Sequence, residues 1–171
     1  MKIMEKIHSI TGSRTVRLIS LITIVVSAMI LASACGVEDE PSTPAGKMIL
    51  QFKSKYVTGE APEKIAKEMI DSDILPFSAV VETVKPGFLN GFDKDITGFK
   101  RGAVIAPEIG AIPFVAYIFE LDNVNDIDSF ITRLEDSYNL RWNVCTEADE
   151  MKIASSGNGV FIVMSPIDFD D

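Results

Sequence analysis

The chain has 171 residues, enough for one domain with a hydrophobic core. Four of its 16 basic residues and one of its 25 acidic residues precede Cys35, so the 137 residues from Cys35 onward carry 12 basic and 24 acidic side chains. That negative charge disfavours nucleic acid and anionic lipid headgroups as partners. The one histidine, His8, also precedes Cys35, so histidine-dependent nucleophiles and histidine-ligated metals are excluded from the remainder.

The N-terminal segment has the three parts of a secretory signal peptide. An uncharged apolar run extends from Leu18 to Leu31, and the small residues 32–34 follow it. Its fourteen residues are fewer than the roughly 20 that a membrane-spanning helix needs. We therefore predict that residues 1–34 form an apolar leader helix that directs export. The basic residues before this run are Lys2, Lys6, Arg14 and Arg17.

The end of this leader, Leu31-Ala32-Ser33-Ala34-Cys35, resembles the lipobox of bacterial lipoproteins. It departs from the family's pattern at Ala32, where a leucine is preferred. The resemblance implies cleavage before Cys35, attachment of fatty acids such as palmitate through its sulfur, and anchoring to the extracytoplasmic face of the cell membrane. Two alternatives are an uncleaved leader acting as a short anchor and plain secretion with an incidental cysteine.

Residues 36–46 contain two prolines, two glycines and three consecutive acids, a composition typical of a disordered tether. We expect Cys35 and this tether to occupy residues 35–46, and a single α+β domain to occupy residues 47–171.

Two segments of that domain predict amphipathic helices. Residues 61–72 begin with Pro62 and place apolar residues at helical spacing. Asn123 or Asn125 caps a second helix that extends to about Tyr138, with apolar residues on one face. Residues 47–56 fit a helix and a strand equally well.

Alternating or continuous apolar runs predict four or five strands, mostly antiparallel. Residues 113–121 and 160–164 are apolar on both faces and so predict central strands. Residues 102–106 and 150–155 pair with them as hairpins, and residues 78–84 are a weaker strand candidate. We expect the last residues, 168–171, to be frayed.

A Gly-Phe pair occurs three times between Lys85 and Arg101, ending in Phe88, Phe92 and Phe99. These aromatic side chains either present a flexible loop to a ligand or pin a glycine-rich loop onto the core, and we favour the second interpretation. The acidic stretch 122–128 lacks the glycine and glutamate of a calcium loop and fits helix capping better.

The stretch from residue 141 to residue 150 contains the one tryptophan of the chain. A candidate binding patch consists of Arg141, Trp142, Asn143 and Glu147, which combine an aromatic surface with polar groups. Alternatively, Trp142 fills the end of the core, and we favour that interpretation. Without a histidine nearby, we expect Cys145 to be a buried, inert thiol rather than a nucleophile.

The segments 107–114, 117–121, 139–143, 145–150 and 159–166 resemble uncharacterised lipid-anchored domains of Gram-positive bacteria, grouped as a domain of unknown function. The resemblance implies an α+β lipoprotein and supplies no catalytic residues. No catalytic, cofactor or metal site has a signature in the sequence. We therefore expect a non-enzymatic module that binds a protein or small ligand at the cell envelope. The alternative is an envelope enzyme that uses carboxylates.

Overall fold

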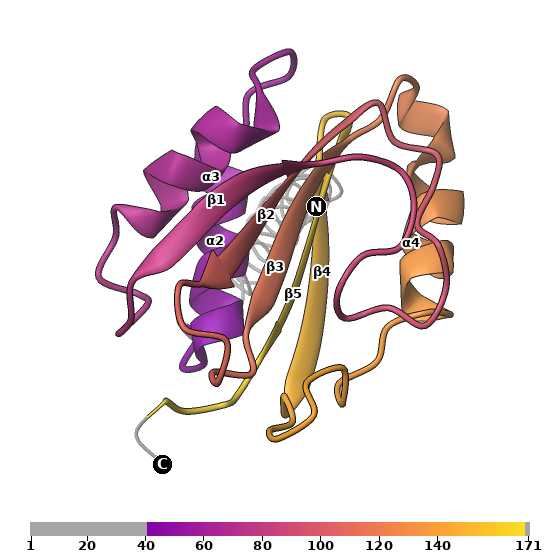
Figure 1. Ribbon diagram of the computed structural model, residues 1–171. Helices are drawn as coiled ribbons and strands as arrows, with labels where there is room; N and C mark the ends of the chain where they lie inside the picture. Colours follow the sequence, from indigo (N-terminus) through magenta and orange to yellow (C-terminus); the bar gives the residue numbers. More distant parts are fainter. Residues whose placement is uncertain (1–40, 170–171) are drawn as a thin grey trace, which may run out of the picture. The chain divides into compact units, whose positions relative to one another are not determined.

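The computed structural model describes residues 41–169 (Figure 1). The predicted leader, Cys35, the first part of the tether and residues 170–171 lie outside these residues. The elements in chain order are α2 (Pro44–Lys55), α3 (Pro62–Ile70), β1 (Ala79–Val84), β2 (Arg101–Pro107), β3 (Val115–Glu120), the 3₁₀ turn η1 (Val124–Asp126), α4 (Ile127–Glu135), β4 (Glu150–Ser156) and β5 (Gly159–Ser165).

The five strands form one antiparallel sheet in the order β1-β2-β3-β5-β4. Every residue of β3 and β5 is buried, which confirms the two predicted central strands. β1 and β4 lie at the two edges of the sheet, as Figure 1 shows. The α+β class and the antiparallel sheet are thus confirmed, although the described residues contain three α-helices rather than the two predicted.

The additional helix, α2, forms from the segment whose pattern was ambiguous. The Thr43 hydroxyl accepts a hydrogen bond from the Gly46 amide at 3.2 Å, and Pro44 occupies the first turn. Ala45, Met48 and Phe52 then lie on one buried face. The predicted tether is therefore wrong at residues 44–46, because these residues form the first turn of a packed helix.

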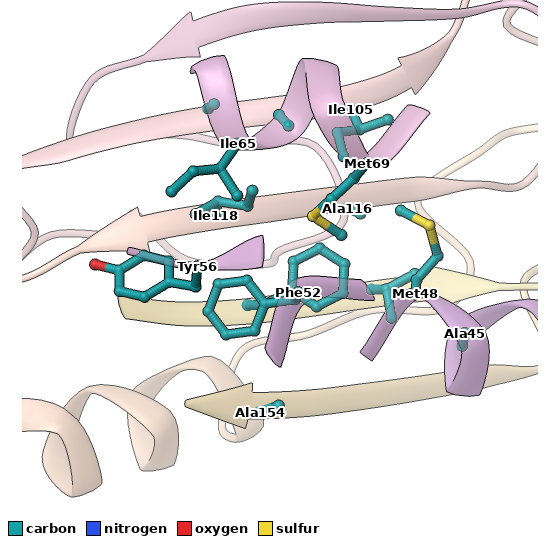
Figure 2. Packing of buried hydrophobic residues seen from close by; sticks show 14 of the residues in the cluster. Ala45, Met48, Phe52, Tyr56, Ile65, Met69, Ile105, Ala116, Ile118 and Ala154 are labelled. Atoms are coloured by element: carbon teal, nitrogen blue, oxygen red, sulfur yellow. The ribbon is translucent and has the colours of Figure 1, made fainter. Parts of the chain in front are cut away.

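One face of the sheet is covered by α2 and α3. Figure 2 shows Ile65 of α3 beside the strand residue Ile118 and Met69 of α3 beside Ala116, and Phe52 and Met48 of α2 belong to the same buried cluster. The Phe52 and Phe161 rings stack with their centroids 5.3 Å apart. Burial of this apolar surface holds the two helices on the sheet, since each buried methylene contributes about 0.8 kcal/mol.

The opposite face is covered by α4 and by the glycine-rich loop between β1 and β2. Phe92 and Phe99 are buried there, so the interpretation that this loop is pinned to the core is confirmed for these two residues. It is wrong for Phe88, whose side chain is 70% exposed.

The second predicted helix is shorter than expected. The side chain of Asn123 accepts a hydrogen bond from the Asn125 amide at 3.0 Å, as the capping interpretation requires. However, α4 ends at Glu135, because Tyr138 forms a β-bridge with Phe92 and the Asn139 amide donates to the Gly91 carbonyl oxygen at 2.8 Å. The loop that covers the sheet thus competes with the last helical turn for backbone hydrogen bonds.

Candidate binding site

Three segments distant in sequence meet at one end of the sheet: the β2–β3 loop, the segment before β4 and the chain after β5. The Asn143 side-chain amide donates to the Gly110 carbonyl oxygen at 2.9 Å, and the Thr146 hydroxyl donates to the Ala111 carbonyl oxygen at 3.2 Å. The Ile167 amide donates to the Asp149 carboxylate at 3.0 Å. These side-chain bonds tie the three segments together.

A pocket of about 510 Å³ lies between these segments, and we call it the acidic pocket. Phe77, Ile112 and Phe169 provide its apolar wall, and the Phe77 ring packs edge-on against Phe169 with centroids 5.2 Å apart. The predicted fraying is therefore wrong for residues 168 and 169, because Phe169 packs on Phe77 and Phe114. The polar lining consists of Thr146, Glu147, Asp149 and Asp168.

A second pocket of about 330 Å³, the tryptophan pocket, adjoins the first. Ile112 lines both pockets and so forms part of the wall between them. No ionisable side chain is among the described residues that line the tryptophan pocket, where Trp142 is the largest side chain. The residues that line it are Asn90, Ala106, Pro107, Gly110, Ile112, Phe114, Val115, Trp142, Asn143 and Val144.

A buried tyrosine of the sheet holds Asn90, one of the residues that line the tryptophan pocket, in place. The hydroxyl of Tyr117, on the central strand β3, donates to the Asn90 carbonyl oxygen at 2.8 Å. Burial raises the pKa of Tyr117, so its phenol keeps this proton. The bond fixes the glycine-rich loop where it borders the pocket.

The structure brings the four predicted patch residues together but assigns them different places. Trp142 and Asn143 line the tryptophan pocket, whereas Glu147 lines the acidic pocket. Arg141 lines neither; its Nε lies 3.3 Å from the Glu147 Oε2, and its side chain is 78% exposed. Trp142 is partly buried and packs against the core beneath α4, and it also lines the tryptophan pocket, so both interpretations of this residue stay open.

The prediction for Cys145 is wrong, because its side chain is exposed. It follows Val144, which is 100% exposed at the rim of the tryptophan pocket. Two more exposed apolar side chains lie beside pocket residues: Ile109, 72% exposed, and Ile167, 56% exposed. Exposed apolar groups gathered around a depression are typical of an interaction surface.

Sequence reasoning missed the acidic pocket's other lining residues. Phe77 precedes β1 and Phe169 follows β5, so no local pattern places them together. Asp149 was not among the predicted patch residues, and its hydrogen bond to Ile167 depends on the position of the chain after β5. The fold alone assembles these groups.

No three His, Cys, Asp or Glu side chains within residues 41–169 are arranged to hold a metal ion. None of the helices described there is long and apolar enough to cross a membrane.

The fold and the two pockets define an antiparallel α+β domain with a concave surface at one end of its sheet. Comparisons with family models, curated proteins and solved structures gave no match to this chain. The resemblance to lipid-anchored domains drawn from the sequence therefore stays a prediction.

Proposed function

We propose that the chain is a lipid-anchored, non-enzymatic binding module on the extracytoplasmic face of the cell membrane. The leader and Cys35 support the proposed location at the membrane, and the pair of adjoining pockets supports the binding role. The observation that carries the proposal is that three separate segments, tied by side-chain hydrogen bonds, form one concave surface with exposed apolar residues at its rim.

The anchor would hold the domain close to the membrane. Because α2 begins at Pro44, the eight residues 36–43 lie between Cys35 and this helix. Fully extended, eight residues span at most about 28 Å. A partner of this surface would therefore be another component of the envelope, within a few tens of ångströms of the bilayer.

One observation favours the alternative, an enzyme that uses carboxylates: Glu147, Asp149 and Asp168 line the same pocket. All three residues are exposed and none is enclosed by apolar side chains. Glu147 also pairs with Arg141, and Asp149 accepts a backbone hydrogen bond. Enzymes of this kind keep one carboxylic acid protonated in an apolar environment, which this arrangement does not provide.

Lipid anchoring and location are tested by growing the source cells with a clickable palmitate analogue. Wild-type protein should take up the label and sediment with membranes, while Cys35→Ser should do neither, because it lacks the sulfur that carries the lipid. Unlabelled, cytosolic wild-type protein with its first methionine intact would overturn the proposed location.

The binding role is tested with a photo-crosslinking amino acid placed at Val144 in intact cells. The matched control is Val124, which is 56% exposed at the start of η1. The proposal predicts a discrete crosslinked product from position 144 and none of the same size from position 124. Equal, diffuse crosslinking from both positions would contradict a binding role for this surface.

A further inference from the structure

We infer that the concave surface binds a basic, apolar polypeptide segment: an arginine or lysine side chain enters the acidic pocket, and an apolar side chain two positions away enters the tryptophan pocket. This inference rests on the proposed function, which it extends by naming the chemistry of the partner. It is carried by the different linings of two pockets that share Ile112.

Charge selects the side chain for the acidic pocket. Three carboxylate residues line it, and no lysine or arginine is among its described lining residues. An anion would meet repulsion there, whereas a cation would be attracted. The tryptophan pocket, without ionisable lining residues, suits an uncharged apolar side chain instead.

The shape of a basic side chain also fits the acidic pocket. Lysine and arginine carry three or four methylenes below a charged end, and such stems pack along apolar surface while the charge stays near water. Here the wall of Phe77, Phe169 and Ile112 would receive the stem. The carboxylates of Glu147 and Asp149 would receive the charge.

Arg141 of the chain itself forms the kind of ion pair with Glu147 that we infer for the ligand's basic group. Its guanidinium Nε lies 3.3 Å from the Glu147 carboxylate, yet Arg141 approaches from outside the pocket lining. With side chains 78% and 52% exposed, this ion pair is weak and can exchange with another cation. Arg141 is thus an internal competitor of the ligand's basic group.

A polypeptide fits the surface better than a lone small cation. The two pockets lie side by side, which matches side chains two positions apart on one face of an extended segment. Val144 lines the tryptophan pocket, and Ile109 and Ile167 add exposed apolar area beyond both pockets, so a small amine in the acidic pocket would leave all three uncovered. The net negative charge of the domain would also accelerate encounter with a basic partner.

The test uses the full-length protein in nonionic detergent and the fluorescence of Trp142, the one tryptophan of the chain. The probes are acetyl-Gly-Arg-Gly-Leu-Gly-amide, which places Arg and Leu on one face of an extended segment, and two counterparts with glutamate or neutral citrulline in place of arginine. We expect the arginine peptide to bind at least tenfold more tightly than the glutamate peptide, and the citrulline peptide to fall between them. Preference for glutamate, or no fluorescence change with any peptide, would overturn the inference.

Two variants with opposite expected effects sharpen the test. Glu147→Gln should weaken binding of the arginine peptide about threefold, as removal of an exposed charge pair does. Arg141→Gln should strengthen it two- to threefold by removing the competitor. Asp122→Asn is the control for general charge: Asp122 follows β3 at the end of the sheet away from the pockets, and the change should leave affinity within a factor of 1.5. Weaker binding by Arg141→Gln would indicate an anionic ligand and overturn the inference.

The outcome separates this inference from the proposed function. If position 144 crosslinks a discrete partner in cells and Glu147→Gln leaves the yield unchanged, the binding role stands and the basic partner is rejected. If Glu147→Gln lowers that yield and Arg141→Gln raises it, both are supported. If position 144 gives no product above the Val124 control, neither survives.

Discussion

Asn143 donates its side-chain amide to the carbonyl oxygen of Gly110 across 2.9 Å, which joins the segment before β4 to the tip of the β2–β3 loop. The bond borders the tryptophan pocket, because both residues line it. The shape of the concave surface therefore depends on a contact between residues 33 positions apart.

Asn143→Ala should loosen this loop while leaving the fold intact. We expect a loss of about 0.5–1 kcal/mol in the free energy of unfolding, typical of one exposed hydrogen bond, and faster amide exchange in residues 108–112. The matched control is Ser54→Ala, which removes an exposed hydroxyl bond to the Gln51 carbonyl oxygen on α2. Equal exchange of the loop in both variants would contradict a positioning role for Asn143.

Gly91 tests how closely the glycine-rich loop packs on the sheet. Its φ is +90°, and a Cβ atom there would lie 2.5 Å from the Met164 Cε. Gly91→Ala should therefore lower the free energy of unfolding by about 3 kcal/mol, combining backbone strain with steric overlap. Gly59→Ala is the control, since Gly59 has a similar φ of +89° but no neighbouring atom within 4 Å. It should lose only about 1 kcal/mol in urea denaturation, and equal losses would refute close packing at Gly91.

Arg101 and Glu120 form an ion pair beneath the loop between α2 and α3. Glu120 is buried, and Arg101 also donates to the carbonyl oxygens of Gly59 and Glu60. Arg101→Gln should cost about 1–2 kcal/mol, because it leaves a buried carboxylate without its cation. The double variant with Glu120→Gln should regain part of that loss. Additive losses in the double variant would argue against coupling.

From the same ion pair we predict that part of the free energy of unfolding is lost at acid pH. The hydrogen bond from Arg101 lowers the pKa of Glu120 from its ordinary value of 4.5. A carboxyl whose pKa is lower in the folded state adds stability above pH 4.5, and this is lost as the pH falls through the lowered value. Arg101→Gln should flatten that part of the profile of unfolding free energy between pH 5 and pH 2. An unchanged profile would contradict the assignment.

For Tyr56 we predict a contribution to the free energy of unfolding that is lost at alkaline rather than acid pH. Burial raises the pKa of Tyr56 from 10.0 to about 12, and its hydroxyl donates to the Asn158 side-chain oxygen at 2.9 Å. Because the folded chain holds this proton more tightly, the stabilisation is complete below pH 10 and is lost as the pH rises towards 12. Tyr56→Phe should reduce the slope of unfolding free energy against pH in this range and cost about 1 kcal/mol at pH 8. A slope equal to the wild type would refute it.

The sheet was predictable because its central strands carry their own signal. The runs that became β3 and β5 are apolar on both faces, and only a strand covered on both sides can bury all of them. The helix α2 was not resolved by periodicity, since its buried face begins at Ala45, inside the stretch assigned to the tether. The capping residues Thr43 and Pro44 were the available signal.

The candidate site was predictable only where its residues are neighbours in sequence. Trp142, Asn143 and Glu147 were grouped because they occur within six positions of an aromatic and polar stretch. Phe77, just before β1, and Phe169, after β5, meet in the same place although they lie far apart in sequence, and each residue alone resembles any core phenylalanine. Tertiary contacts, which a local pattern does not contain, bring them together.

The two cysteines allow a direct test of the anchor by counting thiols. Cys145 is exposed, so it should react with a thiol reagent such as Ellman's reagent without denaturant. If the sulfur of Cys35 carries a lipid, the full-length protein unfolded in denaturant should give one reactive thiol per chain, and Cys145→Ser should give none. Cys35→Ser should also give one, from Cys145, but should no longer sediment with membranes. Two thiols in membrane-associated wild-type protein would rule out lipid attachment through Cys35, because both sulfurs would then be free.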